Sequence, residues 1–99
     1  MARLVLLDED GGNAGAWEIS ETPLAVGRDV SADVIISDDA LSRRHFLVVR
    51  QGKSYLLKDL NSQNGTWVDG RRAEQTQLRD HDCIVAGRTL FVFSAGQRA

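Results

Sequence analysis

The sequence predicts an all-β domain: a β-sandwich of about eleven short strands, with its ligand-binding loops gathered at one end. Apolar runs are short, about three to five residues, and clusters of turn-forming residues separate them, which is typical of strands. No stretch shows sustained helical periodicity. With 99 residues, the chain is long enough for one domain with a modest core but not for two.

The expected strands follow one another with turn signals between them. Gly52 marks a hairpin turn at residues 51–53, because glycine accepts positive φ. Asp69-Gly70 is a preferred pair for a two-residue hairpin turn, and Gly87-Arg88 marks another. The strands are expected at residues 4–7, 17–19, 24–26, 34–36, 45–49, 55–57, 66–68, 83–86 and 89–93.

Composition limits the classes of partner. The formal net charge is −2, so no general electrostatic field attracts the chain to nucleic acid or to an anionic membrane. No apolar stretch approaches the length of a membrane span. The N-terminal apolar run is too short for a secretory signal, so a cytoplasmic location is expected.

The sequence offers little support for metal or thiol chemistry. Cys83 is the only cysteine, which excludes a disulfide within the chain. Because Cys83 opens an apolar strand, we expect a buried and unreactive thiol. Two histidines and one cysteine, scattered along the chain, do not make a zinc site. We therefore expect no metal and no cofactor.

Three short motifs bring phosphate-binding chemistry to the predicted loops. They are Gly27-Arg28, then residues 42–45 with the sequence Ser-Arg-Arg-His, then residues 61–66 with the sequence Asn-Ser-Gln-Asn-Gly-Thr. Arginine offers a planar, permanently charged fork that matches phosphate geometry. Serine adds a neutral donor, and asparagine can both donate to and accept from a peptide main chain. Together the motifs predict a binder of phosphorylated peptides.

These motifs, with the all-β pattern around them, resemble the forkhead-associated (FHA) domain family. The resemblance covers residues 24–93 and includes Asp59-Leu60 before the third motif and residues 66–70 after it. It implies a β-sandwich over residues 1–94 whose loops at one end bind phosphothreonine peptides without catalysis. Residues 95–99 would then be a flexible tail or the start of a linker.

The resemblance implies a set of peptide contacts. Arg28 would bind the phosphate, Ser42 would donate its hydroxyl to another phosphate oxygen, and the backbone N–H of Arg43 would join it. Asn64 would hold the peptide main chain. Gln63, which stands where the family often has a smaller hydroxyl residue, is counted with these contacts.

Three further residues are implied to support the site. Gly27 would let the chain bend so that the next residue points outward. His45 would brace the loop that carries the serine, and Gly65 would permit a tight turn.

Charged residues around the motifs carry two more expectations. Four acids lie in the loops near the proposed site, and like-charge repulsion would disfavour acidic residues beside the phosphothreonine. These are Asp29, Asp33, Asp38 and Asp39. The pairs Arg43-Arg44 and Arg71-Arg72 are expected to be solvated loop residues, with one of them contacting the peptide, because two short pairs are weak evidence for nucleic-acid binding.

The expected function is a non-catalytic reader of phosphothreonine in Ser/Thr kinase signalling, which tethers a phosphorylated protein such as a kinase or its substrate. The alternative is a phosphorylation-independent scaffold or self-association domain of the same fold. Enzyme activity is not expected. Ser42 and His45 suggest part of a hydrolase triad, but no Gly-x-Ser-x-Gly elbow accompanies them.

Overall fold

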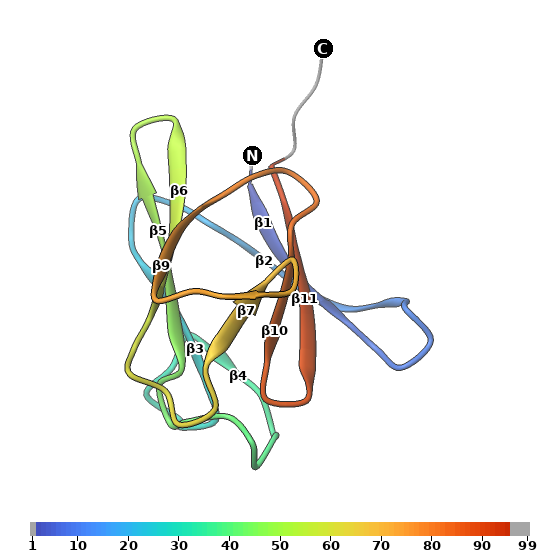
Figure 1. Ribbon diagram of the computed structural model, residues 1–99. Coiled ribbons are helices and arrows are strands. Elements are labelled where there is room, and N and C mark those ends of the chain that lie inside the picture. Colours follow the sequence, from blue (N-terminus) through green and yellow to red (C-terminus); the bar gives the residue numbers. More distant parts are fainter. Residues whose placement is uncertain (1, 96–99) are drawn as a thin grey trace.

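Two β-sheets pack face to face in the computed structural model, which describes residues 2–95 (Figure 1). The described residues form eleven strands, and none of them lies in a helix long and apolar enough to cross a membrane. The strands are β1 (Arg3–Leu7), β2 (Asn13–Glu18), β3 (Leu24–Gly27), β4 (Val34–Ile35), β5 (Phe46–Gln51), β6 (Ser54–Asp59), β7 (Thr66–Val68), β8 (Arg71–Arg72), β9 (Gln75–Leu78), β10 (Cys83–Ala86) and β11 (Thr89–Ser94). The predicted all-β sandwich is confirmed.

The strands divide into a six-stranded and a five-stranded sheet. The larger sheet has the order β2-β1-β11-β10-β7-β8, and the smaller has the order β4-β3-β5-β6-β9. Neighbouring strands are antiparallel except β3 and β4, which are parallel. The chain passes from one sheet to the other between β6 and β7, so the third motif lies on a connection between the two layers.

Alternating side chains from both sheets form the core. Ile84 in β10 and Phe91 in β11 are fully buried from the larger sheet, and Phe46 in β5 is fully buried from the smaller one. The rings of Phe46 and Phe91 meet edge to face across the layers, with centroids 5.7 Å apart and an interplanar angle of 82°, an arrangement that aromatic pairs prefer. The period-two burial is the pattern expected of strands with one covered face.

The predicted hairpin turns are present. Asp69 and Gly70 both have positive φ, 50° and 85°, as a two-residue turn with the local twist of the strands requires. Gly52 (φ 61°) and Gly87 (φ 60°) make the other two turns. The paired residues on either side, such as Val68 and Arg71, show that each turn contains two residues.

Two strands were missing from the sequence prediction. Strand β8 is only Arg71–Arg72, and β9 (Gln75–Leu78) has one buried apolar residue, Leu78. Neither segment has an apolar pattern, and both become strands by pairing with β7 and β6. Arg71 and Arg72 are therefore strand residues, and their expected place in a loop was wrong.

The outward side of the six-stranded sheet carries an apolar patch. Cross-strand neighbours form one row of Trp67, Val85, Leu90 and Leu7, and a second row of Cys83, Val92, Val5 and Ala16. We call these eight residues the outer apolar face. Cys83 is exposed, so the expected burial of its thiol was wrong. The reason is that Ile84 and Ala86 of the same strand point into the core, which places Cys83 and Val85 on the opposite side.

Several connections lie together at one end of the sandwich, at the bottom of Figure 1. They are the β3–β4, β4–β5 and β6–β7 loops and the β10–β11 turn. Strand β1 begins and β11 ends at the other end. Ala95, assigned by the sequence to the tail, donates its N–H to Asp80 (2.8 Å) and packs against the core. Residues 96–99 of the predicted tail lie outside the described residues.

Candidate functional site

Arg28 is held beside Ser42 by two hydrogen bonds. Arg28 is the first residue after β3, and its backbone N–H donates to the carbonyl oxygen of Ser42 (3.3 Å). Its Nε donates to the carbonyl oxygen of Leu41 (2.8 Å). The first bond holds the Arg28 backbone, and the second holds its side chain through Nε. The terminal amino groups of the guanidinium have no hydrogen-bond partner among residues 2–95, and the side chain is exposed.

The Ser42 hydroxyl links the β4–β5 loop to the β6–β7 loop. Its Oγ accepts the backbone N–H of Gln63 (3.0 Å). A hydroxyl that accepts one bond still has a proton to donate, so Ser42 can serve a further acceptor in front of it. The link to Gln63 uses the main chain, and the exposed Gln63 side chain forms no hydrogen bond to another described residue.

His45 joins the same two loops from inside the protein. The residue is fully buried. Its Nδ1 accepts the backbone N–H of Ser42 (3.0 Å), so Nε2 carries the proton and donates to the carbonyl oxygen of Gly65 (2.8 Å). Both ring nitrogens are therefore bonded to backbone groups, and neither is bonded to the serine hydroxyl. The His45 ring is thus bonded to both the β4–β5 loop and the β6–β7 loop.

Asn64 links the β6–β7 loop to the β4–β5 loop through its side chain. Its Nδ2 donates to the carbonyl oxygen of Ala40 (2.8 Å), and its side chain is exposed. The next residue, Gly65, has a φ of 84°, which any other residue would adopt only with strain. Gly65 thus makes the tight turn expected of it, and that turn presents Asn64 at the surface.

Gly27 has a different physical role from the one predicted. Its φ is not positive, so it does not make an unusual bend. A β-carbon there would overlap the carbonyl oxygen of Arg43 and lie 2.9 Å from the α-carbon of Arg44. The residue is needed because the β4–β5 loop passes directly over β3. The exposed Arg43 side chain has no hydrogen bond within residues 2–95, while its carbonyl oxygen accepts the N–H of Asp29 (3.1 Å).

Asp59 organises the third motif, a role that the sequence prediction did not include. Its carboxylate accepts the Ser62 hydroxyl (2.6 Å), the Ser62 backbone N–H (3.0 Å) and the Thr66 hydroxyl (2.7 Å). Burial by itself would raise the pKa of Asp59, but the hydrogen bonds from Ser62 and Thr66 outweigh it and hold the pKa below the usual value. The spacing of an aspartate three residues before a serine was a usable sign of this local cap.

Asp38 organises the β4–β5 loop through hydrogen bonds to its carboxylate. Its carboxylate accepts the backbone N–H groups of Ala40 (2.9 Å) and Arg88 (2.8 Å) and the Thr89 hydroxyl (2.7 Å). Burial raises the pKa of Asp38, but these hydrogen bonds outweigh it and lower the pKa overall. Asp38 thereby ties the β4–β5 loop to the β10–β11 turn, which no local sequence signal predicts.

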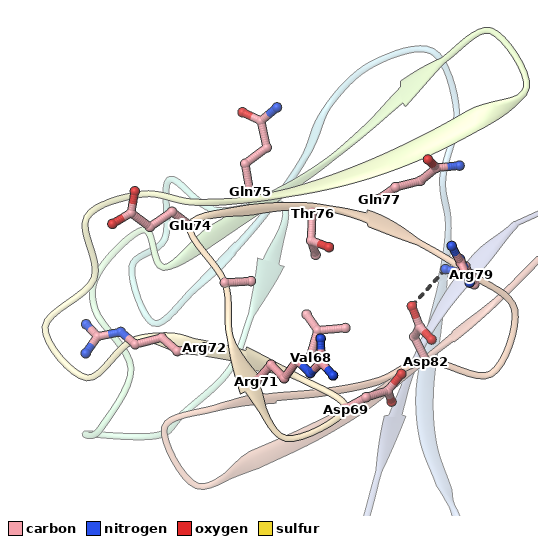
Figure 2. Close-up of a pocket in the computed structure, with 11 residues that line it drawn as sticks. Val68, Asp69, Arg71, Arg72, Glu74, Gln75, Thr76, Gln77, Arg79 and Asp82 are labelled. Atoms are coloured by element: carbon pink, nitrogen blue, oxygen red, sulfur yellow. Dashed lines mark hydrogen bonds between the residues drawn. The ribbon is translucent and has the colours of Figure 1, made fainter.

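The site is a surface formed by loops and is separate from the cavity in Figure 2. That cavity has a volume of about 720 Å³ and lies between β8 and β9. Its lining includes Arg71, Thr76 and Asp82, and it includes neither Arg28 nor Ser42 nor Asn64. The described residues hold no group of three His, Cys, Asp or Glu side chains that could bind a metal.

Comparison with protein families and curated relatives finds a match to the FHA domain. The family model matches residues 24–87. The FHA domain-containing protein FhaA of Mycobacterium tuberculosis is 35% identical over 88 residues, which are 89% of this chain and 17% of FhaA. The oxoglutarate dehydrogenase inhibitor of Corynebacterium diphtheriae is 33% identical over 96 residues, which are 96% of this chain and 67% of that protein.

Solved structures agree with this match. A structure from a structural and functional analysis of phosphothreonine-dependent FHA domain interactions superposes with a TM-score of 0.86 and 32% identity, covering 94% of both chains. The crystal structure of the FhaA FHA domain complexed with the intracellular domain of Rv3910 superposes with a TM-score of 0.85 and 32% identity, covering 94% of this chain and 99% of that one.

Proposed function

The chain belongs to the FHA domain family, and from that membership and the loop geometry we propose that it is a non-catalytic recognition module for phosphothreonine. In this proposal the domain tethers a protein phosphorylated by a Ser/Thr kinase, either the kinase or its substrate. The supporting relatives include a domain studied for phosphothreonine-dependent interactions. The chain spans a small part of FhaA. We include a cytoplasmic location of the module in the same proposal.

The observation that carries the proposal is the fixed pair of Arg28 and Ser42. The Nε of Arg28 is bonded to Leu41, so the terminal amino groups of the guanidinium remain for a ligand. The Ser42 hydroxyl can donate beside them. A phosphothreonine brings about −1.5 to −2 charges and three strong acceptors. Each charged hydrogen bond contributes about 1.5–3 kcal/mol net, so a short peptide would bind with about −8 kcal/mol, or micromolar affinity.

The remaining contacts would hold the peptide main chain. The Asn64 Nδ2 is used by Ala40, so its side-chain oxygen would accept a peptide N–H, and its second amide proton would serve a peptide carbonyl. The backbone N–H of Arg43 would add to the phosphate contacts, and the exposed side chain of Gln63 would lie along the peptide. We place this module in residues 1–94.

The arrangement of Ser42 and His45 favours binding over catalysis. A nucleophilic serine needs a base within hydrogen-bond reach of its oxygen. His45 instead accepts the Ser42 backbone N–H and donates to Gly65, while the Ser42 oxygen accepts the N–H of Gln63. No proton path joins the histidine ring to the serine hydroxyl through these bonds. This geometry supports a module without enzyme activity.

Fluorescence anisotropy with a degenerate peptide library, four random residues on each side of a fixed central residue, tests the proposal. We expect micromolar binding when the central residue is phosphothreonine and at least tenfold weaker binding when it is threonine. Arg28→Ala should lose most of the affinity without a large loss of stability, because the side chain is exposed. Arg50→Ala is a matched control, since Arg50 is exposed on β5 and bonds only its own turn at Gly52. Equal binding of both libraries would refute the proposal.

The outer apolar face favours a second candidate, a phosphorylation-independent scaffold of the same fold. Exposed Trp67 and Val85 (each 39% exposed) are cross-strand neighbours within it, and clustered apolar surface often marks a protein interface. Sedimentation of phosphatase-treated protein tests self-association through this face. A dimer that Val85→Lys disrupts, with peptide binding absent, would favour the scaffold over the reader.

A further inference from the structure

The guanidinium of Arg72 lies against the loop that presents Asn64. A β-carbon on Gly65 would lie 2.7 Å from the Arg72 Nε, 3.0 Å from its Cζ and 3.3 Å from one terminal nitrogen. Arg72 pairs across the strands with Trp67, and in Figure 2 its side chain and that of Arg71 extend in different directions. Its charged group is thus located next to the third motif.

The distance from the phosphate donors to Arg72 can be bounded along the chain. The Ser42 oxygen is 3.0 Å from the backbone nitrogen of Gln63. Gly65 is two residues after Gln63, so their α-carbons are at most about 7.6 Å apart. The Arg72 guanidinium lies beside Gly65. With the two intervening covalent bonds and the 2.7 Å from the Gly65 β-carbon position to the Arg72 Nε, the distance is at most about 16 Å, which an extended peptide spans in four to five residues.

Arg72 is also available to a ligand. Its side chain is exposed, and it forms no ion pair or hydrogen bond with another described residue. It lines a cavity of about 460 Å³ together with Asn61, Asp59 and Glu74. The carboxylate of Asp59 is occupied by Ser62 and Thr66. In Figure 2 the Glu74 and Arg72 side chains both extend to the left, separated from each other, and no ion pair joins them in the described part of the chain.

The four acids expected to repel acidic ligand residues lie on other segments of the chain than Arg72. The acids Asp29, Asp33, Asp38 and Asp39 all lie on the β3–β4 and β4–β5 segments. Arg72 lies beyond Asn64, beside the β6–β7 loop. These four acids would repel acidic ligand residues that lie beside the β3–β4 and β4–β5 segments. They would not repel an acidic ligand residue that lies beside Arg72.

We propose that Arg72 selects an acidic residue within about five positions of the phosphothreonine, on the side of the peptide that passes over Asn64 and Gly65. The guanidinium would pair with the ligand carboxylate in a fork geometry. This inference rests on the proposed function, since it specifies the sequence around the phosphothreonine that the same loops hold.

A glutamate scan tests the assignment. The probes are fluorescent phosphothreonine peptides with alanine at all other positions and one glutamate or one glutamine at each position from five before to five after. We expect wild-type protein to prefer glutamate over glutamine by about three- to tenfold at one position or two adjacent positions. Arg72→Gln should abolish that preference, and Arg72→Lys should retain part of it.

Arg71→Gln is the matched control, because Arg71 has the same charge in the same strand but does not line the cavity that Arg72 shares with Asn61. It should keep the glutamate preference. A preference that survives Arg72→Gln, or equal binding of glutamate and glutamine peptides at every position, would overturn the inference. Neither of these results affects the proposed function, which instead fails if the all-alanine phosphothreonine peptide binds no better than its unphosphorylated form. Unfolding curves of each variant show whether the fold is kept.

Discussion

Gly27 and Arg43 pack backbone against backbone, with no room between them for a side chain. A β-carbon on Gly27 would overlap the carbonyl oxygen of Arg43 and lie 2.7 Å from its carbonyl carbon. Hydrogen bonds fix this approach from both sides, since His45 donates its N–H to Val26 (2.7 Å) and Asp29 donates to Arg43 (3.1 Å). The loop that carries Ser42 is therefore held flat against the end of β3.

Gly27→Ala should destabilise the domain and disrupt the site together. The loop must move to admit the methyl group, at a cost of about 3 kcal/mol, and movement of the loop separates Arg28 from Ser42. Urea unfolding and phosphopeptide titration measure the two effects. The control is Gly12→Ala, whose new β-carbon would meet only the Asp8 side chain at 3.1 Å. If Gly27→Ala matched that control in stability, the close approach would not constrain the loop.

His45→Ala should weaken folding and peptide binding even though the ring touches no ligand. The change leaves the buried carbonyl of Gly65 and the partly buried N–H of Ser42 unpaired and opens a cavity. We expect a loss of about 2–4 kcal/mol in the free energy of unfolding. His81→Ala should change it by less than about 0.5 kcal/mol, because the His81 side chain is 83% exposed. Equal losses for the two variants would contradict this assignment.

Asp59 should contribute to acid unfolding. Burial opposes ionisation, but the hydrogen bonds from Ser62 and Thr66 keep the folded-state pKa of Asp59 below the ordinary value of 3.8. A lowered folded-state pKa means that the ionised carboxylate adds stability above pH 3.8 and that this stability is lost as the pH falls through the folded-state pKa.

Asp59→Asn should therefore lower the free energy of unfolding by about 1–3 kcal/mol at pH 7 and by less near pH 3. Urea titrations at both pH values give the difference. Glu9→Gln is a suitable control, since the Glu9 carboxylate in the β1–β2 turn accepts no hydrogen bond within residues 2–95. A deficit in Asp59→Asn that is the same at both pH values would exclude the titration of Asp59 as its source.

Asp82→Asn should stabilise the domain at neutral pH. Burial raises the pKa of Asp82, and the neighbouring Asp69 carboxylate adds to the rise. A raised folded-state pKa of a carboxyl group means that stability is full below pH 3.8 and is lost as the pH rises through the folded-state pKa.

Asparagine at position 82 keeps an acceptor for the Arg79 N–H (2.8 Å; Figure 2) without the charge. The gain in the free energy of unfolding should be below about 1 kcal/mol because water screens the repulsion between Asp69 and Asp82, and it should disappear near pH 3. Thermal unfolding at pH 7 and pH 3 measures it. A variant less stable than the wild type at pH 7 would show that the carboxylate is favourable there.

The sequence anticipated the fold well where local chemistry decides it. Strands with apolar alternation, such as β5 and β11, were expected within a few residues of their bounds. The Asp69-Gly70 turn follows from residues that accept positive φ. Strands β8 and β9 could not be expected from their residues, because long-range pairing with β7 and β6 makes them strands.

For the candidate site, the sequence by itself determined which chemical groups are offered: a guanidinium, a hydroxyl and an amide in loops that lead to one end of a sandwich. Only the tertiary structure decided how they are held. Arg28, Ser42 and Asn64 are brought together by hydrogen bonds between residues 13 to 24 positions apart. Gly27 is required by a contact with a distant backbone segment, and Arg72 reaches the loop by cross-strand pairing. Such contacts depend on the packing of whole strands, so no local pattern encodes them.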